Sequence, residues 1–507
     1  MTTLVQFMLH CLWLLAPLVV FPSSSSAQSV KTSLGTIHGV IDRSNPSVRQ
    51  FLGIPYAKPP IGDLRWDRPH PVEEFGDIQA KKLPPSCPQY LGVSRGNFYS
   101  QEVLEFNLQG LNKTGSISED CLTLSVWTPL GARRGDNLPI LIYIYGGGFS
   151  TGGQDVPYQI PTQWVQRTKS HIVVSFNYRV NMFGFPRSAG VESQNLGLLD
   201  QRMAIEWVRD NIYHFGGDKT RMSLWGQSAG AMSVAYYTYA YPENPIVSSL
   251  ILDSASEFTN LGSGESDTDH SNFTFVAENL GCQRDSPAEE LACMRQVPFQ
   301  DIEDFIQEHT EQGTTPSLAF KPVPDGRLVF SNYTERSLLG AQGKIPAIVG
   351  TAAQDGYPFG YTGNGVDTTV AEQVTLSLFL CPAYKTSSNR LAAGLDTWRY
   401  EYRGNFSNVS PVPYIGAYHS SELPMIFGTH GLFRGPSTKL EKATSAAMQD
   451  AYLTFTATRG SRKAMLKHGW HVYEKSRKNP LRIFGERVAD KDGNINEQEL
   501  ECKRLYS

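Results

Sequence analysis

The feature of this sequence that most restricts its fold is an alternation of short apolar runs with helical patterns. The runs are rich in Ile and Val, apolar on both faces, and end at glycine or turn residues: Pro139–Tyr145, Ile172–Tyr178, Met222–Trp225, Leu250–Asp253 and Ile345–Thr351. Such runs are typical of buried parallel strands. Apolar residues recur at helical spacing over Asp200–Phe215, and Gly216-Gly217 ends that pattern. The alternation predicts an α/β protein with an open, mostly parallel sheet that helices cover on both faces.

Composition excludes several classes of protein. The 507 residues are 40% hydrophobic and 19% charged, which is too apolar and too weakly charged for a disordered chain. The net charge of −4 provides no general attraction for nucleic acid or for an anionic membrane. We therefore expect a globular protein that does not bind nucleic acid. Composition points to no other partner, and the sequence leaves the oligomeric state open.

The first 27 residues have the layout of a secretory signal peptide. Residues 11–21 (CLWLLAPLVVF) form an apolar run that is too short to span a membrane and contains Pro17. Small residues at Ser25 and Ala27 suit cleavage after Ala27, although no Lys or Arg precedes the run. A signal anchor or a buried N-terminal helix is the alternative. No other apolar stretch is long enough to cross a bilayer, so we expect a secreted protein.

Cysteines and glycosylation sequons agree with secretion. Removal of residues 1–27 takes away Cys11 and leaves an even number of cysteines: Cys87, Cys121, Cys282, Cys293, Cys381 and Cys502. An even number in a secreted chain predicts three disulfides, and Cys282 and Cys293 are close enough in sequence to close a short loop. Five sequons are candidates for N-glycosylation: Asn112, Asn272, Asn332, Asn405 and Asn408.

The pattern G-x-S-x-G, which marks a nucleophilic serine at a strand-to-helix turn, occurs three times. Gly92–Gly96 has no strand before it, and Gly148–Gly152 runs into polar residues and a proline rather than a helix. Gly226–Gly230 (GQSAG) follows the run Met222–Trp225 and opens the helix-prone segment Ala229–Tyr239. Only this copy has the context that the motif requires, so Ser228 is the candidate nucleophile. A purely structural turn is the alternative.

A serine hydrolase also needs backbone donors for the oxyanion of its tetrahedral intermediate. Tyr145–Phe149 (YGGGF) directly follows the run Pro139–Tyr145, and consecutive glycines let main-chain N–H groups turn toward one point. A flexible linker is the alternative. We expect the N–H groups of Gly147, Gly148 and Ala229 to form the oxyanion hole.

Longer segments carry a family resemblance. Asn195–Gly230 reads NLGLLDQRMAIEWVRDNIYHFGGDKTRMSLWGQSAG and resembles the type-B carboxylesterase/lipase family, which includes cholinesterases and has the α/β-hydrolase fold. Supporting segments are Phe51–Pro60 (FLGIPYAKPP), Glu119–Pro129 (EDCLTLSVWTP), Tyr145–Phe149 and Ile415–Gly428 (IGAYHSSELPMIFG). The likeness is closest to secreted fungal carboxylic ester hydrolases, in part through Trp398–Phe406 (WRYEYRGNF). The resemblance implies disulfides Cys87–Cys121 and Cys282–Cys293, which leaves Cys381–Cys502 as the third pair.

The resemblance also selects the acid and the histidine of a triad. Asp355 in Gly350–Phe359 (GTAAQDGYPF) occupies the acid position, where most relatives carry Glu. Asp355 also follows the run Ile345–Thr351 and precedes Gly356, but an ordinary turn aspartate, or Asp325 as the acid, are alternatives. Composition does not choose among the six histidines after Ser228: His270, His309, His419, His430, His468 and His471. The segment GAYHSSEL selects His419, which gives the family's chain order of serine, acid, histidine.

These assignments predict one α/β-hydrolase domain over residues 28–507 that cleaves neutral carboxylic esters through an acyl-enzyme. Choline esters are not expected, because the stretch Pro88–Asp120 has no Trp for a cation and Gln227 stands where cholinesterases carry Glu. A lipase with the Cys87–Cys121 loop as its lid is one alternative. A non-catalytic interaction domain is another, which the presence of all three triad residues disfavours.

No cofactor or metal is expected. No Cys/His cluster has the spacing of a zinc site. The segment Asp490–Glu501 (DKDGNINEQELE) begins like a calcium-binding loop, but Ile495 stands where that loop needs Gly. We interpret the segment as a polar turn that enters a short helix.

Overall fold

The computed structural model describes residues 28–90, 117–261, 267, 269–362, 365–410, 412–432, 434–474, 480–494 and 496–505. The predicted signal peptide, residues 1–27, lies outside this described part. So do the sequon at Asn112 and the first copy of the serine motif, Gly92–Gly96.

A ten-stranded sheet forms the centre of the molecule, in the spatial order β15-β14-β13-β10-β9-β8-β6-β7-β5-β3. Its strands are β3 (Val48–Pro55), β5 (Thr123–Pro129), β6 (Leu138–Ile144), β7 (Ile172–Phe176), β8 (Gly217–Gln227), β9 (Ser249–Asp253), β10 (Ala347–Ala352), β13 (Thr397–Tyr402), β14 (Pro480–Phe484) and β15 (Asp490–Asn494). Neighbours from β7 through β14 pair parallel, and the pairs β3/β5, β5/β7 and β14/β15 are antiparallel. The predicted mostly parallel sheet is confirmed.

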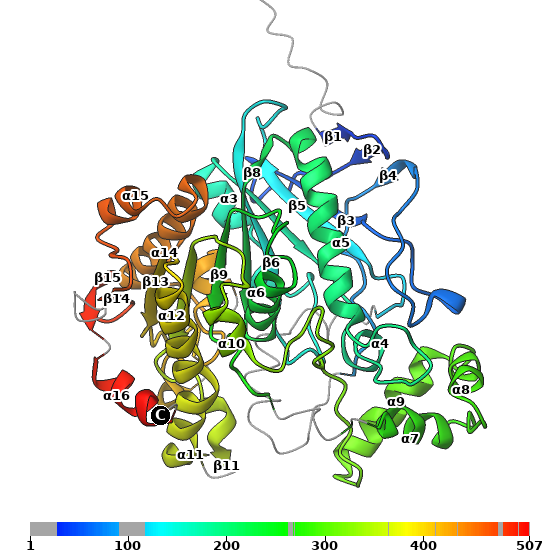
Figure 1. Cartoon of the computed structure of the whole chain (residues 1–507). Helices are drawn as coiled ribbons and strands as arrows, with labels where there is room; N and C mark the ends of the chain where they lie inside the picture. The colour runs from blue at the N-terminus through cyan, green and yellow to red at the C-terminus, as the bar shows by residue number, and fades with distance from the viewer. Residues whose placement is uncertain are drawn as a thin grey trace, which may run out of the picture.

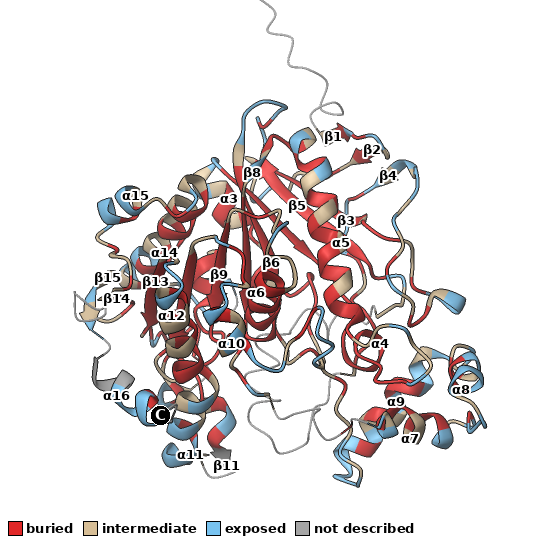
Figure 2. Cartoon of the chain, in the orientation of Figure 1, coloured by how far each residue is buried: buried red, intermediate tan, exposed pale blue. Residues whose placement is uncertain are grey.

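Helices cover both faces of this sheet (Figure 1). Helices α5, α6 and α12 pack on one face, while α3 and α14 pack on the other. The helices are α3 (Thr162–Thr168), α4 (Asn181–Gly184), α5 (Leu196–Asn211), α6 (Ala229–Ala240), α7 (Ser271–Asn279), α8 (Pro287–Met294), α9 (Phe299–Glu311), α10 (Tyr333–Leu338), α11 (Thr368–Val374), α12 (Cys381–Ala392), α13 (Leu423–Phe427), α14 (Lys439–Thr458), α15 (Arg462–Lys467) and α16 (Asn496–Leu505). Because both faces of the sheet are covered, the central strands β6, β7, β9 and β10 are buried along nearly their whole length (Figure 2).

The helical pattern predicted from Asp200 begins earlier, at Leu196, and ends in a 3₁₀ turn, Ile212–Phe215. Gly216 then adopts φ 98°, a left-handed conformation that glycine reaches without strain and that ends the helix. The predicted glycine stop is confirmed.

The main hydrophobic core lies around the sheet, and a second cluster lies outside it. Helices α7, α8 and α9 pack around buried residues that include Trp66, Phe183 and Phe273. Figure 1 shows these three helices together at one corner of the molecule, next to α4. Residues 28–507 as a single domain stays a prediction.

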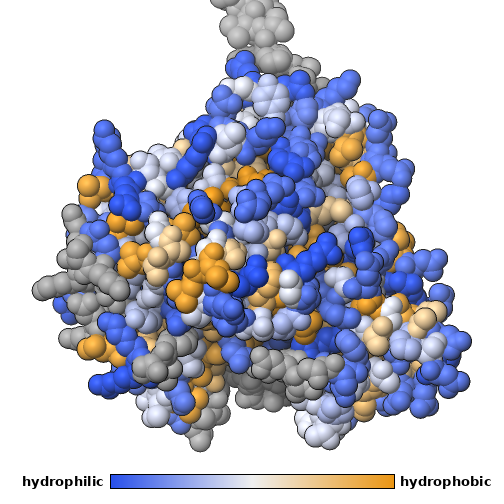
Figure 3. Space-filling model, in the orientation of Figure 1, coloured by the Kyte–Doolittle hydropathy of each residue, from blue (hydrophilic) through white to orange (hydrophobic). Residues whose placement is uncertain are grey.

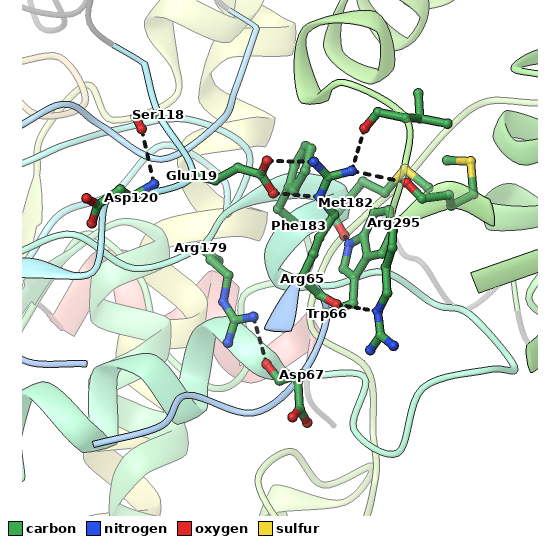
Figure 4. Close-up of polar contacts among 12 residues, drawn as sticks. Arg65, Trp66, Asp67, Ser118, Glu119, Asp120, Arg179, Met182, Phe183 and Arg295 are labelled. Carbon is green, nitrogen blue, oxygen red and sulfur yellow. Dashed lines mark hydrogen bonds and ion pairs between the residues drawn. The ribbon is translucent and has the colours of Figure 1, made fainter. Parts of the chain in front are cut away.

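Arg65 joins this corner to the base of the Cys87–Cys121 loop. Its Nε and Nη2 donate to both carboxylate oxygens of Glu119 at 2.6 Å, and Nη1 donates to the carbonyls of Met294, at the end of α8, and Val297, between α8 and α9. Figure 4 shows the guanidinium between the carboxylate and the two carbonyls. The side chains of the ion pair are 7% and 11% exposed, so this fork-to-fork contact is well shielded from solvent.

The surface is polar over most of the face in Figure 3, with hydrophobic residues in scattered groups. Within the described residues, no helix is long and apolar enough to cross a membrane.

The segment Asp490–Glu501 was predicted to be a polar turn that enters a short helix, and the prediction of a turn was wrong for its first five residues. Residues Asp490–Asn494 form strand β15, which pairs antiparallel with β14, and helix α16 follows. The carboxylates of Asp490 and Asp492 face the guanidinium of Arg482 on β14, so they are engaged in ion pairs across the two strands.

Three disulfides join Cys87 to Cys121, Cys282 to Cys293 and Cys381 to Cys502. The pairing is the one that the family resemblance implied. The third disulfide ties α16, near the end of the chain, to the start of α12.

Candidate active site

Ser228 lies in the sharp turn between β8 and α6. The strand ends at Gln227, the helix begins at Ala229, and Ser228 itself has φ 56° and ψ −126°. A non-glycine residue held at positive φ is strained. The Ser228 N–H donates to the Asp253 carbonyl at 2.8 Å, which helps to hold this conformation. The turn therefore has the strand–turn–helix context that the sequence predicted for a nucleophilic serine.

The two glycines of this motif allow the backbone to pack closely. A Cβ on Gly226 would lie 2.2 Å from the Gly230 carbonyl oxygen, and one on Gly230 would lie 2.0 Å from the Ile144 carbonyl oxygen. Real side chains do not approach backbone atoms so closely, so larger residues would force the turn apart.

The glycine loop after β6 lies against Ser228. A Cβ on Gly146 would lie 2.8 Å from that of Ser228, while Gly147 and Gly148 take positive φ values of 105° and 64°. The N–H groups of Gly147, Gly148 and Ala229 donate no hydrogen bond to any group in the described part of the chain. These donors remain available to a ligand, as an oxyanion hole requires.

Asp355 and His419 form a buried hydrogen-bonded pair. Asp355 follows β10, and its Oδ1 accepts from His419 Nδ1 at 2.9 Å, with side chains 0% and 4% exposed. Its other oxygen, Oδ2, accepts from the Ala352 N–H at 2.8 Å and from Ser254 Oγ at 3.0 Å. A carboxylate at Nδ1 fixes the imidazole tautomer that leaves the Nε2 lone pair free to accept a proton.

His419 Nε2 points toward the turn that holds Ser228. It lies 3.3 Å from the side-chain amide nitrogen of Gln227, and Ser228 and His419 form no hydrogen bond with each other. The rings of Phe359 and Phe379 pack near the imidazole, with centroids 5.6 and 4.6 Å away. Gln227 is thus a contact of His419 that the sequence did not predict.

The alternatives from the sequence do not reach this pair. Asp325 Oδ1 accepts the backbone N–H groups of Arg327, Leu328 and Val329, which makes it a turn residue. His309 and His430 have hydrogen-bonding partners elsewhere, in the turn after α9 and at Ser437. Ser150, in the motif copy Gly148–Gly152, lies in the loop after β6 with no helix behind it.

A cavity of 530 Å³ contains Ser228, His419, Gly147 and Gly148 in its wall. One part of its lining is apolar: Val156, Leu261, Phe359, Leu378 and Phe379. Leu378 and Phe379 come from a π-helical turn, Thr375–Leu380, directly before α12. The remaining lining includes polar side chains, among them Gln159 and Lys321.

Two further carboxyl groups lie buried behind the Asp355–His419 pair. Burial raises the pKa of Asp253 to about 6, even though Trp225, Tyr400 and Tyr452 donate hydrogen bonds to it. Burial, followed by repulsion from Asp355 and Asp253, raises the pKa of Glu422 well above its usual range. The raised pKa favours the neutral form of Glu422 beside the pair.

The sequence did not predict Asp253, Glu422 or Ser254 as neighbours of the Asp355–His419 pair. Glu422 belongs to the same segment as His419, and Ser254 directly follows a predicted strand at the edge of the sheet where sites are expected. Their positions were visible in the sequence, but their contacts with Asp355 depend on the packing of three separate segments.

The sequons differ in exposure. Asn332 and Asn405 are exposed, whereas Asn272 and Asn408 are each 5% exposed. The Asn408 amide also donates to the His430 carbonyl at 2.8 Å. Glycosylation stays a prediction at all five, and the exposed pair has the side chains best placed for it.

Comparisons with known proteins show which family and fold the chain shares. The sequence model of the carboxylesterase family matches residues 26–371 and 362–502. The chain is 44% identical over 461 residues to a chlorogenic acid esterase of Aspergillus niger, covering 89% of this chain and 87% of that protein. It is 38% identical over 474 residues to secreted lipase 5 of Gibberella zeae, covering 88% of each. A solved pNB esterase superposes with a TM-score of 0.77 and 26% identity, over 94% of this chain and 99% of that one.

Proposed function

The chain belongs to the carboxylesterase family and is a carboxylic ester hydrolase with an α/β-hydrolase fold, and from this premise we propose that it works through a Ser228–His419–Asp355 triad. The observation that carries the proposal is the buried 2.9 Å contact between His419 Nδ1 and Asp355 Oδ1, because His419 lines the same cavity as Ser228.

The proposed reaction begins with Ser228. Its Oγ attacks the ester carbonyl carbon while its proton passes to His419 Nε2, and Asp355 stabilises the resulting imidazolium. Collapse of the tetrahedral intermediate breaks the bond to the alcohol oxygen, which takes the proton from His419. Water then attacks the acyl-enzyme by the same route, which releases the carboxylic acid and restores Ser228.

The oxyanion of both intermediates is proposed to bind the N–H groups of Gly147, Gly148 and Ala229. Loss of one such donor typically costs about 3 kcal/mol of transition-state stabilisation. The Ser228–His419 hydrogen bond must form with substrate present, because catalytic hydrogen bonds are often long or absent in an empty site and tighten in the complex.

We propose secretion with cleavage after Ala27. The three disulfides support an oxidising compartment, and one close relative is named a secreted lipase.

For the substrate, we propose neutral carboxylic esters rather than choline esters, because Gln227 is neutral and lies directly beside His419. The chlorogenic acid esterase relative makes chlorogenic acid a substrate to test. Lipase activity is the second candidate, which the apolar part of the cavity lining and the lipase relative favour. A rate jump above the solubility limit of tributyrin would favour the lipase.

The test uses p-nitrophenyl esters of increasing acyl length, with acetylcholine for comparison. Wild-type protein is expected to hydrolyse the neutral esters, and Ser228→Ala is expected to lose this activity while keeping its melting temperature. Ser150→Ala, in the other described copy of the serine motif, is expected to keep most of the activity. Activity that persists in Ser228→Ala would refute the triad, and preference for acetylcholine over a neutral ester of equal acyl length would refute the substrate proposal.

A further inference from the structure

Lys321 brings a positive charge to the wall of the proposed active-site cavity. It lies between α9 and α10 and also lines a neighbouring cavity of 350 Å³. Its Nζ donates to the Leu261 carbonyl at 2.7 Å. An ammonium group has three N–H donors, so two remain for a ligand in the space beside it.

This ammonium has no carboxylate partner among the residues that the structure describes. Glu257, which lines the neighbouring cavity, accepts from Tyr239 and Thr386 instead. Asp267 accepts from Ser271 Oγ and from the Asn272 N–H. The charge of Lys321 is therefore balanced by neither of these nearby carboxylates.

A second cation stands behind Lys321. Arg187 lines the neighbouring cavity and is only 1% exposed. Burial first, and then repulsion by Arg187, lower the pKa of Lys321 from its ordinary value. Asp267 attracts Arg187, whereas burial and the repulsion from Arg187 make the charge of Lys321 costly, and a bound anion would offset that cost.

We propose that Lys321 is the centre of a carboxylate-binding subsite, so that the preferred ester carries a carboxylate group apart from its scissile bond. The inference rests on the proposed function of Ser228 and narrows it. The subsite keeps the exclusion of choline cations and makes an anionic ester the preferred substrate over an uncharged one. Arg187 adds to the positive potential around Lys321 without touching the ligand.

Gln159 adds a second feature to the same cavity. Its Oε1 is buried and has no hydrogen-bond partner in the described part of the chain. Buried acceptors are nearly always satisfied, so this oxygen is a place for a hydroxyl of the substrate. A hydroxylated ester with a free carboxylate would satisfy both groups.

The test compares each carboxylate ester with its methyl-blocked form. Chlorogenic acid and methyl chlorogenate, followed by caffeate release, place the carboxylate on the alcohol side of the ester. Mono-p-nitrophenyl adipate and its methyl ester place it on the acyl side. Wild-type protein is expected to prefer the free carboxylate in at least one pair, by about tenfold or more in kcat/KM, where tenfold corresponds to the weakest hydrogen bonds to charged groups.

Lys321→Met is expected to abolish that preference. KM for the carboxylate ester should rise about tenfold with kcat unchanged, while the constants for the blocked ester stay within about twofold of wild type. Lys219→Met is the matched control, because nine residues at about 3.3 Å each place it about 30 Å before Ser228 along β8. Lys321→Arg should keep part of the preference because it keeps the charge.

The outcomes separate the subsite from the proposed function. No preference in either pair by wild type, or an equal effect of Lys321→Met on both members of a pair, would overturn the subsite. The second result would mean that Lys321 only holds the Leu261 carbonyl. If Lys321→Met does not fold, the wild-type preference alone decides. Hydrolysis of blocked esters that does not depend on Ser228 would instead overturn the proposed function.

Discussion

Asp355 and Asp325 both lie in turns, but their carboxylates accept hydrogen bonds from different groups. Asp355 binds an imidazole nitrogen, a hydroxyl and one backbone N–H, whereas Asp325 binds backbone N–H groups and the side-chain amide of Asn195. The first arrangement suits a residue that orients a base, and the second suits a residue that holds a loop. The two aspartates therefore form a matched pair for mutagenesis.

Asp355→Asn should lower kcat by roughly 10³–10⁴-fold, because an amide at this position donates to Nδ1 and favours the wrong imidazole tautomer. Folding should be kept, since the substitution preserves the shape of the side chain and leaves an amide oxygen that can accept from the Ala352 N–H and Ser254 Oγ. Steady-state kinetics on a p-nitrophenyl ester measures the loss. Asp325→Asn should keep kcat and lose about 1–2 kcal/mol of stability through its turn hydrogen bonds. The opposite pattern would assign the acid to Asp325.

At the residue level, local motifs predicted the backbone context of Ser228 and the contact between Asp355 and His419. They did not predict Gln227 beside His419, or Glu422 and Ser254 near Asp355. Those contacts join side chains from β8 and from the loops after β9, β10 and β13. No motif or residue spacing in the sequence predicts such contacts between distant segments. The same is true of Lys321 and Arg187.

At the level of elements, the five predicted strands all lie in the central sheet because each is apolar on both faces. The strand β13 was missed because Arg399 and Glu401 interrupt its apolar pattern, although both are buried, at 0% and 3% exposure. The strand β15 was read as a turn because its sequence is polar. The strand is held by its pairing with β14 and by the ion pairs of Asp490 and Asp492 with Arg482, not by apolar residues of its own.

Helices α4 and α9 meet through a buried carboxyl group whose titration can be followed. Glu303 on α9 accepts from Asn181 Nδ2 at 2.8 Å, and its Oε2 has no partner among the described residues. Burial raises its pKa from 4.5 to about 8. The folded state therefore holds a proton that the unfolded chain releases above pH 4.5, and stability must fall as the pH rises toward 8.

Glu303→Gln should remove this dependence. Wild type should lose about 3–5 kcal/mol relative to the variant between pH 4.5 and 8.5, with no further divergence above that range. Urea unfolding of both proteins at a series of pH values measures the difference. Parallel stability curves across this range would show that Glu303 ionises normally in the folded protein.

For the whole molecule, the disulfide between Cys381 and Cys502 joins two cysteines that are 121 residues apart in the chain. Closing so long a loop restricts the unfolded chain by about 5 kcal/mol in the loop-entropy description. The double variant Cys381→Ala/Cys502→Ala should therefore unfold at a lower temperature. The variant Cys282→Ala/Cys293→Ala, which opens a loop of 11 residues, should lose less. Equal losses would argue against the loop-length account.

The order of motifs also predicted how the chain builds one site from distant segments. Parallel strands bring their carboxyl ends to one edge of the sheet, which places the residues after β6, β8 and β10 together. His419 reaches this edge from the loop between β13 and β14, which the sheet topology alone did not fix. The family resemblance supplied that residue, and the packing of Asp355 against it agrees.

The central claim is that Ser228 is the nucleophile, and covalent labelling tests it most directly. Protein treated with a serine-directed organophosphate should lose esterase activity in proportion to the incorporation of one equivalent of label, and mass mapping should place the label on Ser228. Ser228→Ala should incorporate none under the same conditions. Stoichiometric labelling of Ser228→Ala, or an adduct on any other residue that tracks the loss of activity, would contradict the claim.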